Sequence, residues 1–258
     1  MSKNRNWADK LPIDIRVEKA KKIANKLVQL IVNIINIHES NRLLIYSDQI
    51  TKQIPPSHAA HTFKLLQQSE FRMEVLSLYA LWDKPSGDRF SIPTLISLVD
   101  NTGVIDALNN EQKEFWMAPP INGWGLEIDD PLARENIVDQ INTNQEAFAN
   151  RQIQKMDRRR RKAIELVSKS SDCTKIKTIR DFRDRYIAHA LDFDDSDDSQ
   201  SPSLKYGDET WLLEKTIKIV DWLYLAVCGT SFSWDQSRKI AKDRAEKFWS
   251  GVKIDVLG

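Results

Sequence analysis

The sequence predicts an all-α fold, and three observations support that prediction. Apolar residues recur at helical spacing along several long stretches. No stretch alternates apolar and polar residues in the way a half-buried strand does. The 258 residues include only 8 glycines and 9 prolines, fewer than the many tight turns of a sandwich or barrel need. With 41% hydrophobic and 29% charged residues, the chain has enough apolar material for a packed core.

The first part of the chain predicts one long helix followed by shorter ones. Residues 15–38 carry apolar side chains at helical spacing and become apolar nearly all round in their second half, which indicates a buried helix. A short helix should follow and end before Pro55, because the residue ahead of a proline is disfavoured in helical backbone. A helix over residues 58–82 comes next, with Ser57 as its expected N-cap.

The stretch "SIPTLISLVDNTG" predicts the start and end of a further helix. Ser91 is its expected cap, Pro93 sits in its first turn, and Gly103 should end it. Residues 111–130 then combine aromatic residues with two prolines and two glycines. We expect this segment to be an irregular, aromatic-rich crossing loop.

The second part of the chain predicts four helical regions and an acidic loop. Residues 131–169 form one or two long polar helices with only a thin apolar stripe, so they either have a partner or project from the body. A helix over 175–190, an acidic loop over 194–203 and an apolar helix over 209–229 follow, and a shorter helix closes the chain.

We expect the helices to form one domain without internal repeats. That domain spans residues 1–258, and its N-terminal helices (about 15–110) pack on a C-terminal half (about 131–258).

Charge and composition limit the classes of function. Lysine plus arginine (38) nearly cancels aspartate plus glutamate (37), so nucleic acid can be bound only by a local basic patch. We find neither a secretory signal nor a stretch long enough to span a bilayer, and expect a cytoplasmic protein without a membrane partner. Cys173 and Cys228 match no metal-ligand spacing, and His58 and His61 lack a third ligand nearby. We therefore expect no metal and no cofactor.

One short stretch, "RDRYIAH", concentrates chemistry that suits phosphate. Arg183 stays charged and offers a fork of donors that matches phosphate oxygens. His189 has an ordinary pKa of about 6.5, so it can accept or donate a proton near neutral pH. Cleavage of RNA needs both properties, because the ribose 2′-hydroxyl must lose a proton while charge develops on the adjacent phosphate.

Two segments resemble a known family. Arg183, Asp184 and His189 resemble the signature of HEPN domains, an arginine and a polar residue followed by a short spacer and a histidine. Residues 78–99, "LYALWDKPSGDRFSIPTLISLV", resemble a segment of the abortive-infection type of HEPN protein. The resemblance implies a bundle of long antiparallel helices and a metal-independent endoribonuclease in phage defence or toxin–antitoxin biology. In that activity His189 is the acid/base, Arg183 stabilises the phosphate, Asp184 orients a side chain or binds the sugar, and the product carries a 2′,3′-cyclic phosphate.

Helical geometry complicates this site. At about 100° per residue, Arg183 and His189 lie about 120° apart around a helix, whereas Arg185 and His189 share a face. Either the helix bends or ends near His189, or a second copy completes the site. The resemblance favours a homodimer with facing motif helices. Arg185 stays a candidate for phosphate binding, and Tyr186 either hydrogen-bonds to phosphate or packs.

The strongest basic run, "DRRRRK", supplies further candidates for substrate binding. Arg158, Arg159, Arg160 and Arg161 could hold an RNA backbone, or they could simply form a solvated helix face. The acidic residues 192–198 would repel RNA unless they fold aside.

The expected partners are RNA, a second copy of the chain and an antitoxin. The alternative is a non-catalytic HEPN module that serves dimerisation or binds a nucleotide or RNA. A third reading is a helical adaptor whose match to the motif is accidental.

Overall fold

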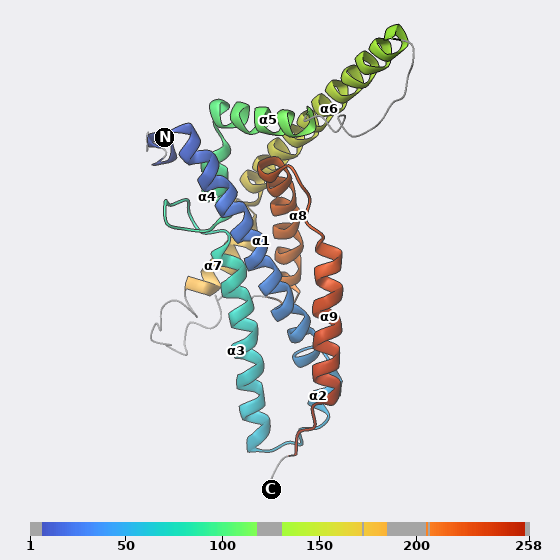
Figure 1. Cartoon of the computed structure of the whole chain (residues 1–258). Helices are drawn as coiled ribbons and strands as arrows, with labels where there is room; N and C mark the ends of the chain where they lie inside the picture. The colour runs from blue at the N-terminus through green and yellow to red at the C-terminus, as the bar shows by residue number, and fades with distance from the viewer. Residues whose placement is uncertain (1–6, 118–130, 172, 185–204, 206, 256–258) are drawn as a thin grey trace.

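The described residues of the computed structural model are helical and contain no strand, which confirms the predicted all-α fold (Figure 1). The structure describes residues 7–117, 131–171, 173–184, 205 and 207–255. The elements are the 3-10 helix Trp7–Lys10, α1 (Ile13–Leu44), α2 (Asp48–Thr51), α3 (His58–Ala80), α4 (Ile92–Val99), α5 (Thr102–Met117), α6 (Pro131–Ser171), α7 (Thr174–Arg183), α8 (Asp208–Cys228) and α9 (Trp234–Gly251).

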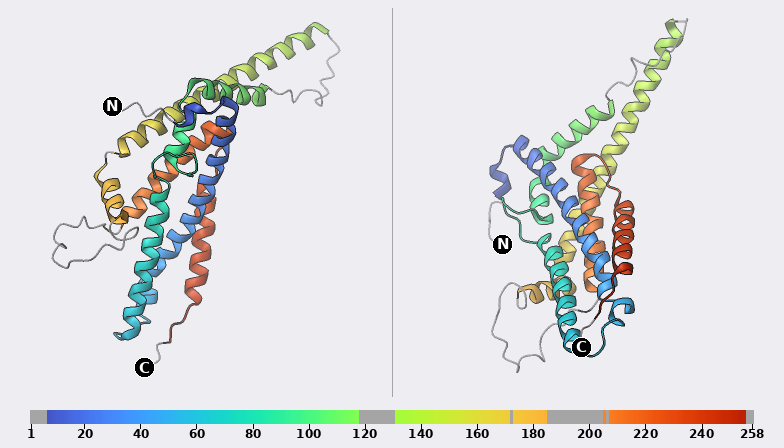
Figure 2. Two further views of the ribbon diagram at one scale, coloured as in Figure 1. Left: turned by 90° about the vertical axis from the view of Figure 1, so that its left-hand side faces the viewer. Right: turned by 60° about the horizontal axis from the view of Figure 1, so that its bottom comes forward.

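Helix α1 is the central helix of the bundle. It packs against α3, α4, α5, α8 and α9. Helices α3 and α8 run antiparallel to it, as the colour gradient in Figures 1 and 2 shows. The long α1 is explained by its sequence, since apolar residues recur on its buried face up to Leu44.

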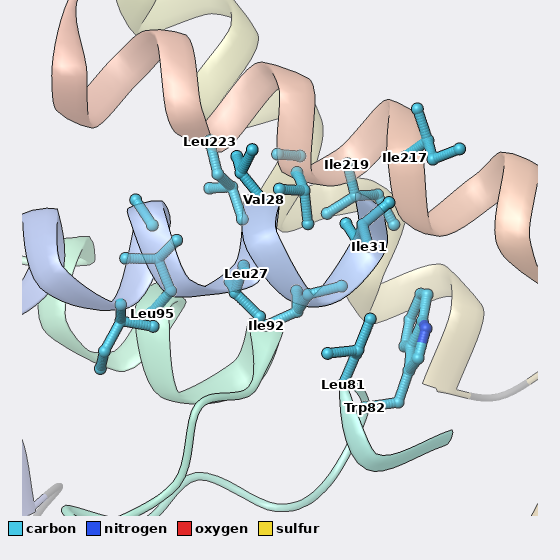
Figure 3. Close-up of a cluster of buried hydrophobic side chains, with 14 of the residues drawn as sticks. Leu27, Val28, Ile31, Leu81, Trp82, Ile92, Leu95, Ile217, Ile219 and Leu223 are labelled. Carbon is cyan, nitrogen blue, oxygen red and sulfur yellow. The ribbon is translucent and has the colours of Figure 1, made fainter. Parts of the chain in front are cut away.

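The hydrophobic core lies where α1 is enclosed by α4 and α8. Figure 3 shows Leu27 and Ile31 of α1 between Ile92 of α4 and Ile219 and Leu223 of α8. All of these side chains are fully buried or nearly so, and burying one such side chain contributes about 1.5–3 kcal/mol. The core therefore fixes α1, α4 and α8 relative to one another.

A buried arginine ties the start of α1 to the end of α4. Arg16 is 2% exposed and donates hydrogen bonds to the carbonyl oxygens of Ser97 and Leu98 at 2.9–3.1 Å. It also pairs with Asp9 at 3.1 Å. The last carbonyls of a helix have no intrahelical donor, so Arg16 supplies the donors that the end of α4 lacks.

Helix boundaries around α4 confirm one sequence prediction and overturn another. Ser91 caps α4, because its Oγ accepts from the backbone N–H of Thr94 at 3.3 Å. Gly103 does not end this helix, which stops at Val99. It lies instead in the first turn of α5, where the Oδ1 of Asn101 accepts from the N–H of Val104 at 3.2 Å. The asparagine before Gly103 starts a new helix, and the glycine ends none.

The prediction of a crossing loop from residue 111 was wrong for its first part. Residues 111–117 continue α5, because they contain good helix formers and the first proline comes only at 119. The rest of that predicted loop lies outside the described residues.

Helix α6 is one continuous helix, and its first half projects beyond the bundle (Figures 1 and 2). Its second half packs against α8. The thin apolar stripe had predicted a partner or a projection, and the structure shows both, because α6 begins beyond the bundle and packs against α5 and α8 further along.

No helix in the described part of the chain is both long and apolar enough to cross a membrane. Across the same residues, histidine, cysteine and carboxylate side chains nowhere gather in a group of three or more that could hold a metal ion. Cys173 and Cys228 are free thiols, and burial raises the pKa of Cys228 to about 11, which keeps that thiol protonated and unreactive at neutral pH.

Candidate functional site

Helix α7 brings the first residue of the RDRYIAH motif to the bundle. Its buried anchors are Ile176 and Ile179, each 1% exposed, and the helix packs against α3 and α6. Arg183 is its last residue.

The segment 78–99 contacts α7 three residues before the RDRYIAH motif begins. Tyr79 belongs to the segment 78–99, and its hydroxyl accepts a short hydrogen bond from Nε of Arg180 in α7. The guanidinium also lies 5.9 Å from the centre of the Tyr79 ring. Tyr79 is 3% exposed and belongs to the core, so it gives the arginine a fixed partner.

The beginning of α7 is fastened to α8. The Nζ of Lys175 lies 2.8 Å from a carboxylate oxygen of Asp208 and 5.3 Å from the ring centre of Trp211. The chain just after α3 is bonded to α8 as well, since Nε1 of Trp82 donates to Oγ1 of Thr216 at 2.9 Å. Helices α3, α7 and α8 therefore form one frame around the start of the motif.

The structure describes only some of the candidate site residues in the motif. Asp184 is half-buried and follows α7 directly, with its backbone N–H bonded to the carbonyl oxygens of Arg180 and Asp181. Arg185, Tyr186 and His189 lie outside the described residues, as does the predicted acidic loop. The meeting of Arg183 with His189, within one chain or across a dimer, thus stays a prediction.

Most arginines of the basic run on α6 are engaged by aspartates. Arg159 lies 3.6 Å from Asp221 of α8, while Arg160 and Arg161 each lie 3.0 Å from Asp157. Arg160 is only 9% exposed, whereas the side chain of Arg161 is 73% exposed. Arg158 is also exposed. This run is therefore partly a structural feature of α6, and its contact with RNA stays a prediction.

A second polar cluster lies deeper in the bundle, around His38. Its Nδ1 is 2.7 Å from Oε1 of Glu74, and Nδ2 of Asn41 donates to Oε2 of Glu74 at 2.8 Å. Burial lowers the pKa of His38, but the hydrogen bond and negative charge of Glu74, with Glu39 and Glu209 nearby, raise that pKa to a net value above its ordinary one. His38 and Glu74 therefore link α1 to α3.

A cavity of about 730 Å³ adjoins this cluster. It is lined by His38 and Arg42 of α1 and by Tyr46, two residues after that helix, together with Glu209 of α8 and Arg238 of α9. Arg42 and Arg238 already pair with glutamates at 2.7 and 2.5 Å, and Tyr46 donates to Glu209 at 2.8 Å. These three side chains already have partners within the protein, and we do not assign the nuclease chemistry to this cavity.

Sequence reasoning missed two residues of the frame, Tyr79 and Arg180. Tyr79 stood in the quoted segment 78–99, and Arg180 lies three residues before the quoted motif. The signal for their contact was absent, because they are 101 residues apart in the chain.

A comparison with family models matches residues 18–248 to the HEPN family described as AbiU2. The match covers most of the chain and includes both segments that carried the resemblance, so the family predicted from them is confirmed. Neither a search of curated proteins nor a search of solved structures gave a significant match.

Proposed function

Since the chain belongs to the AbiU2 family of HEPN domains, we propose that it is a metal-independent endoribonuclease of phage defence or toxin–antitoxin biology. The observation that carries this proposal is the placement of Arg183 and Asp184 at the end of α7, inside the range that matches the family. Such a protein would act in the cytoplasm, where its RNA substrate and an antitoxin partner would be found.

The reaction proceeds by attack of the ribose 2′-hydroxyl on the adjacent phosphorus. His189 accepts the proton of that hydroxyl, the bond from phosphorus to the 5′ oxygen of the next nucleotide breaks, and this oxygen takes up a proton. Arg183 stabilises the negative charge that develops on the phosphate oxygens. Asp184 orients a side chain or binds the sugar. The products are a 2′,3′-cyclic phosphate and a free 5′-hydroxyl.

A homodimer with facing motif helices completes the site in this proposal. Arg183 and His189 lie about 120° apart around a regular helix, and a second copy can supply the group that one helix cannot turn inward. Arg185 and Tyr186 contribute to binding of the substrate.

The contacts that anchor α7 support a role for Arg183 in catalysis. Reacting groups work best on rigid elements whose own positions are fixed by packing. Ile176 and Ile179 are buried, Lys175 is bonded to Asp208, and Arg180 is bonded to Tyr79. These contacts hold the backbone of Arg183 in place before substrate arrives.

The test is cleavage of RNA by the purified chain in EDTA, which removes divalent metal ions. We expect wild-type protein to cleave and His189→Ala to lose about 100-fold or more of the rate while it stays folded. His58→Ala is the matched control, because His58 is an exposed histidine at the start of α3 and its loss should leave cleavage unchanged. Cleavage by His189→Ala at the wild-type rate would overturn the proposal.

The second candidate is a non-catalytic HEPN module for dimerisation or for binding a nucleotide or RNA. The ion pairs of Arg159, Arg160 and Arg161 favour the dimerisation form of this candidate, because they leave less positive charge for an RNA chain. A folded wild-type dimer that leaves RNA intact after long incubation would support this candidate over the nuclease.

A further inference from the structure

We propose that Arg180 is a phosphate-binding residue of the α7 site, oriented by Tyr79, although it lies outside the family motif. This inference rests on the proposed binding of RNA at the end of α7. It assigns the substrate class, an RNA phosphate, to a residue that the signature of arginine, polar residue and histidine does not include.

The first support is the uncompensated charge of Arg180. Its Nε donates to the hydroxyl of Tyr79, an uncharged group, and among the described residues its guanidinium forms no ion pair. The N–H donors of its two terminal NH₂ groups remain available to a ligand. By contrast, Arg159, Arg160 and Arg161 each lie within 3.6 Å of an aspartate oxygen. Arg180 therefore keeps a positive charge that an anion can neutralise.

The second support is the orientation of its side chain. A free arginine loses much rotational freedom when it binds an anion, and a side chain that is already held loses less. Tyr79 holds the guanidinium through the hydrogen bond to its hydroxyl and through the face of its ring, 5.9 Å from the guanidinium carbon. Because Tyr79 itself is 3% exposed, its hydroxyl has little room to move.

The third support is the position of Arg180 on α7. It precedes Arg183 by three residues, and residues three apart on a helix are surface neighbours with Cβ atoms about 5–6 Å apart. Two arginine positions thus follow each other along one side of α7 toward the motif. This spacing suits contact with one phosphate from two sides or with two successive phosphates of one strand.

The test measures how salt weakens the binding of a short single-stranded RNA to His189→Ala protein, which cannot degrade the probe in the proposed reaction. Each phosphate contact to single-stranded nucleic acid contributes about 0.7 to the slope of log affinity against log salt. We expect an added Arg180→Gln to lower that slope by about 0.7 and the affinity by about tenfold at low salt. An added Arg244→Gln removes the same charge from an exposed site on α9, across α1 from α7 (Figure 1), and should leave the slope unchanged.

Two further variants separate phosphate binding from a merely structural role. Arg180→Lys keeps the charge, so it should restore the slope but not the full affinity. Tyr79→Phe keeps the buried ring and removes the hydroxyl, so it should lower affinity a few-fold and leave the slope unchanged. Equal slopes for Arg180→Gln, Arg244→Gln and the parent would overturn the proposal, as would equal slopes for Arg180→Lys and Arg180→Gln.

The two proposals fail in different ways. If wild-type protein leaves RNA intact but Arg180→Gln lowers the salt slope, the nuclease proposal falls and the phosphate contact stands. If wild-type protein cleaves RNA and Arg180→Gln changes neither slope nor affinity, the nuclease proposal stands and the role of Arg180 falls.

Discussion

Two arginine-rich segments, Arg158–Arg161 on α6 and the arginines of α7, look alike in sequence and differ in what surrounds their charge. On α6, three of the four arginines lie next to Asp157 or Asp221. On α7, Arg180 is bonded to the phenol of Tyr79. The comparison teaches that the number of basic residues in a segment does not determine how much positive charge is available to a ligand. The segment with fewer arginines is the better candidate for phosphate.

The largest expected difference between the two segments is in catalysis. Arg183→Ala should slow RNA cleavage by about 100-fold or more, because it removes the donor that stabilises charge on the phosphate in the transition state. Arg158→Ala, the matched loss of an exposed arginine on α6, should change the rate by less than about threefold. Initial rates on one labelled RNA in EDTA measure both. Equal effects of the two substitutions would erase the proposed distinction between the helices.

A large effect on stability should follow from the anchoring of α7. Ile179→Ala removes a side chain that is 1% exposed, and truncating a buried isoleucine costs about 2–5 kcal/mol. We expect a loss of this size in the free energy of unfolding measured with urea. A loss below about 1 kcal/mol would show that α7 is not held to the core in the way described.

The buried pair of His38 and Glu74 extends the comparison to a basic side chain whose acidic partner is fully buried, and its effect on stability should depend on pH. The pKa of His38 is raised in the folded chain. The stabilisation of the folded chain by this pair is therefore fully present below the ordinary histidine pKa of about 6.5. It is lost as pH rises through the higher pKa of His38 in the folded state.

Glu74→Gln should remove most of this pH dependence. The measurement is the free energy of unfolding in urea for the wild-type chain and for Glu74→Gln, between pH about 6 and about 9. We expect the wild-type chain to be the more stable by the largest amount at the acidic end, and the difference in free energy to narrow as pH rises. A gap that is constant or widens with pH would contradict a protonated His38.

The smallest effect is expected on the surface of α6. The ion pair of Arg161 and Asp157 is exposed on its arginine side, and exposed pairs contribute about 0–1 kcal/mol. Arg161→Ala should therefore change the free energy of unfolding by less than about 0.5 kcal/mol. A loss as large as that of Ile179→Ala would mean that the α6 run is a major structural element.

The sequence predicted local features of the fold better than contacts between distant segments. The cap at Ser91 and the end of α8 at Gly229 follow from residue types within one turn of each helix terminus, and both were predicted correctly. Gly103 was misread because a glycine two residues after Asn101 can equally lie in the first turn of a new helix. The bond between Tyr79 and Arg180 depends on the packing of α3 against α7, which periodicity along the chain does not encode.

For the candidate site, the sequence identified the residue types and the family. It left open whether and where Arg183 and His189 come together. Arg183 and Asp184 were placed on a helix, and the structure has α7 ending at Arg183. Ion pairing on α6 could not be predicted for Arg159, because its partner Asp221 belongs to another helix. Charge compensation of this kind depends on tertiary structure.

The chemistry of the cleaved ends tests the central claim most directly. RNA incubated with the purified chain in EDTA should yield fragments that carry a 2′,3′-cyclic phosphate and a 5′-hydroxyl, which mass spectrometry of the fragments would identify. Fragments with a 5′-phosphate and a 3′-hydroxyl, or RNA left intact by folded protein, would contradict an endoribonuclease built on Arg183 and His189.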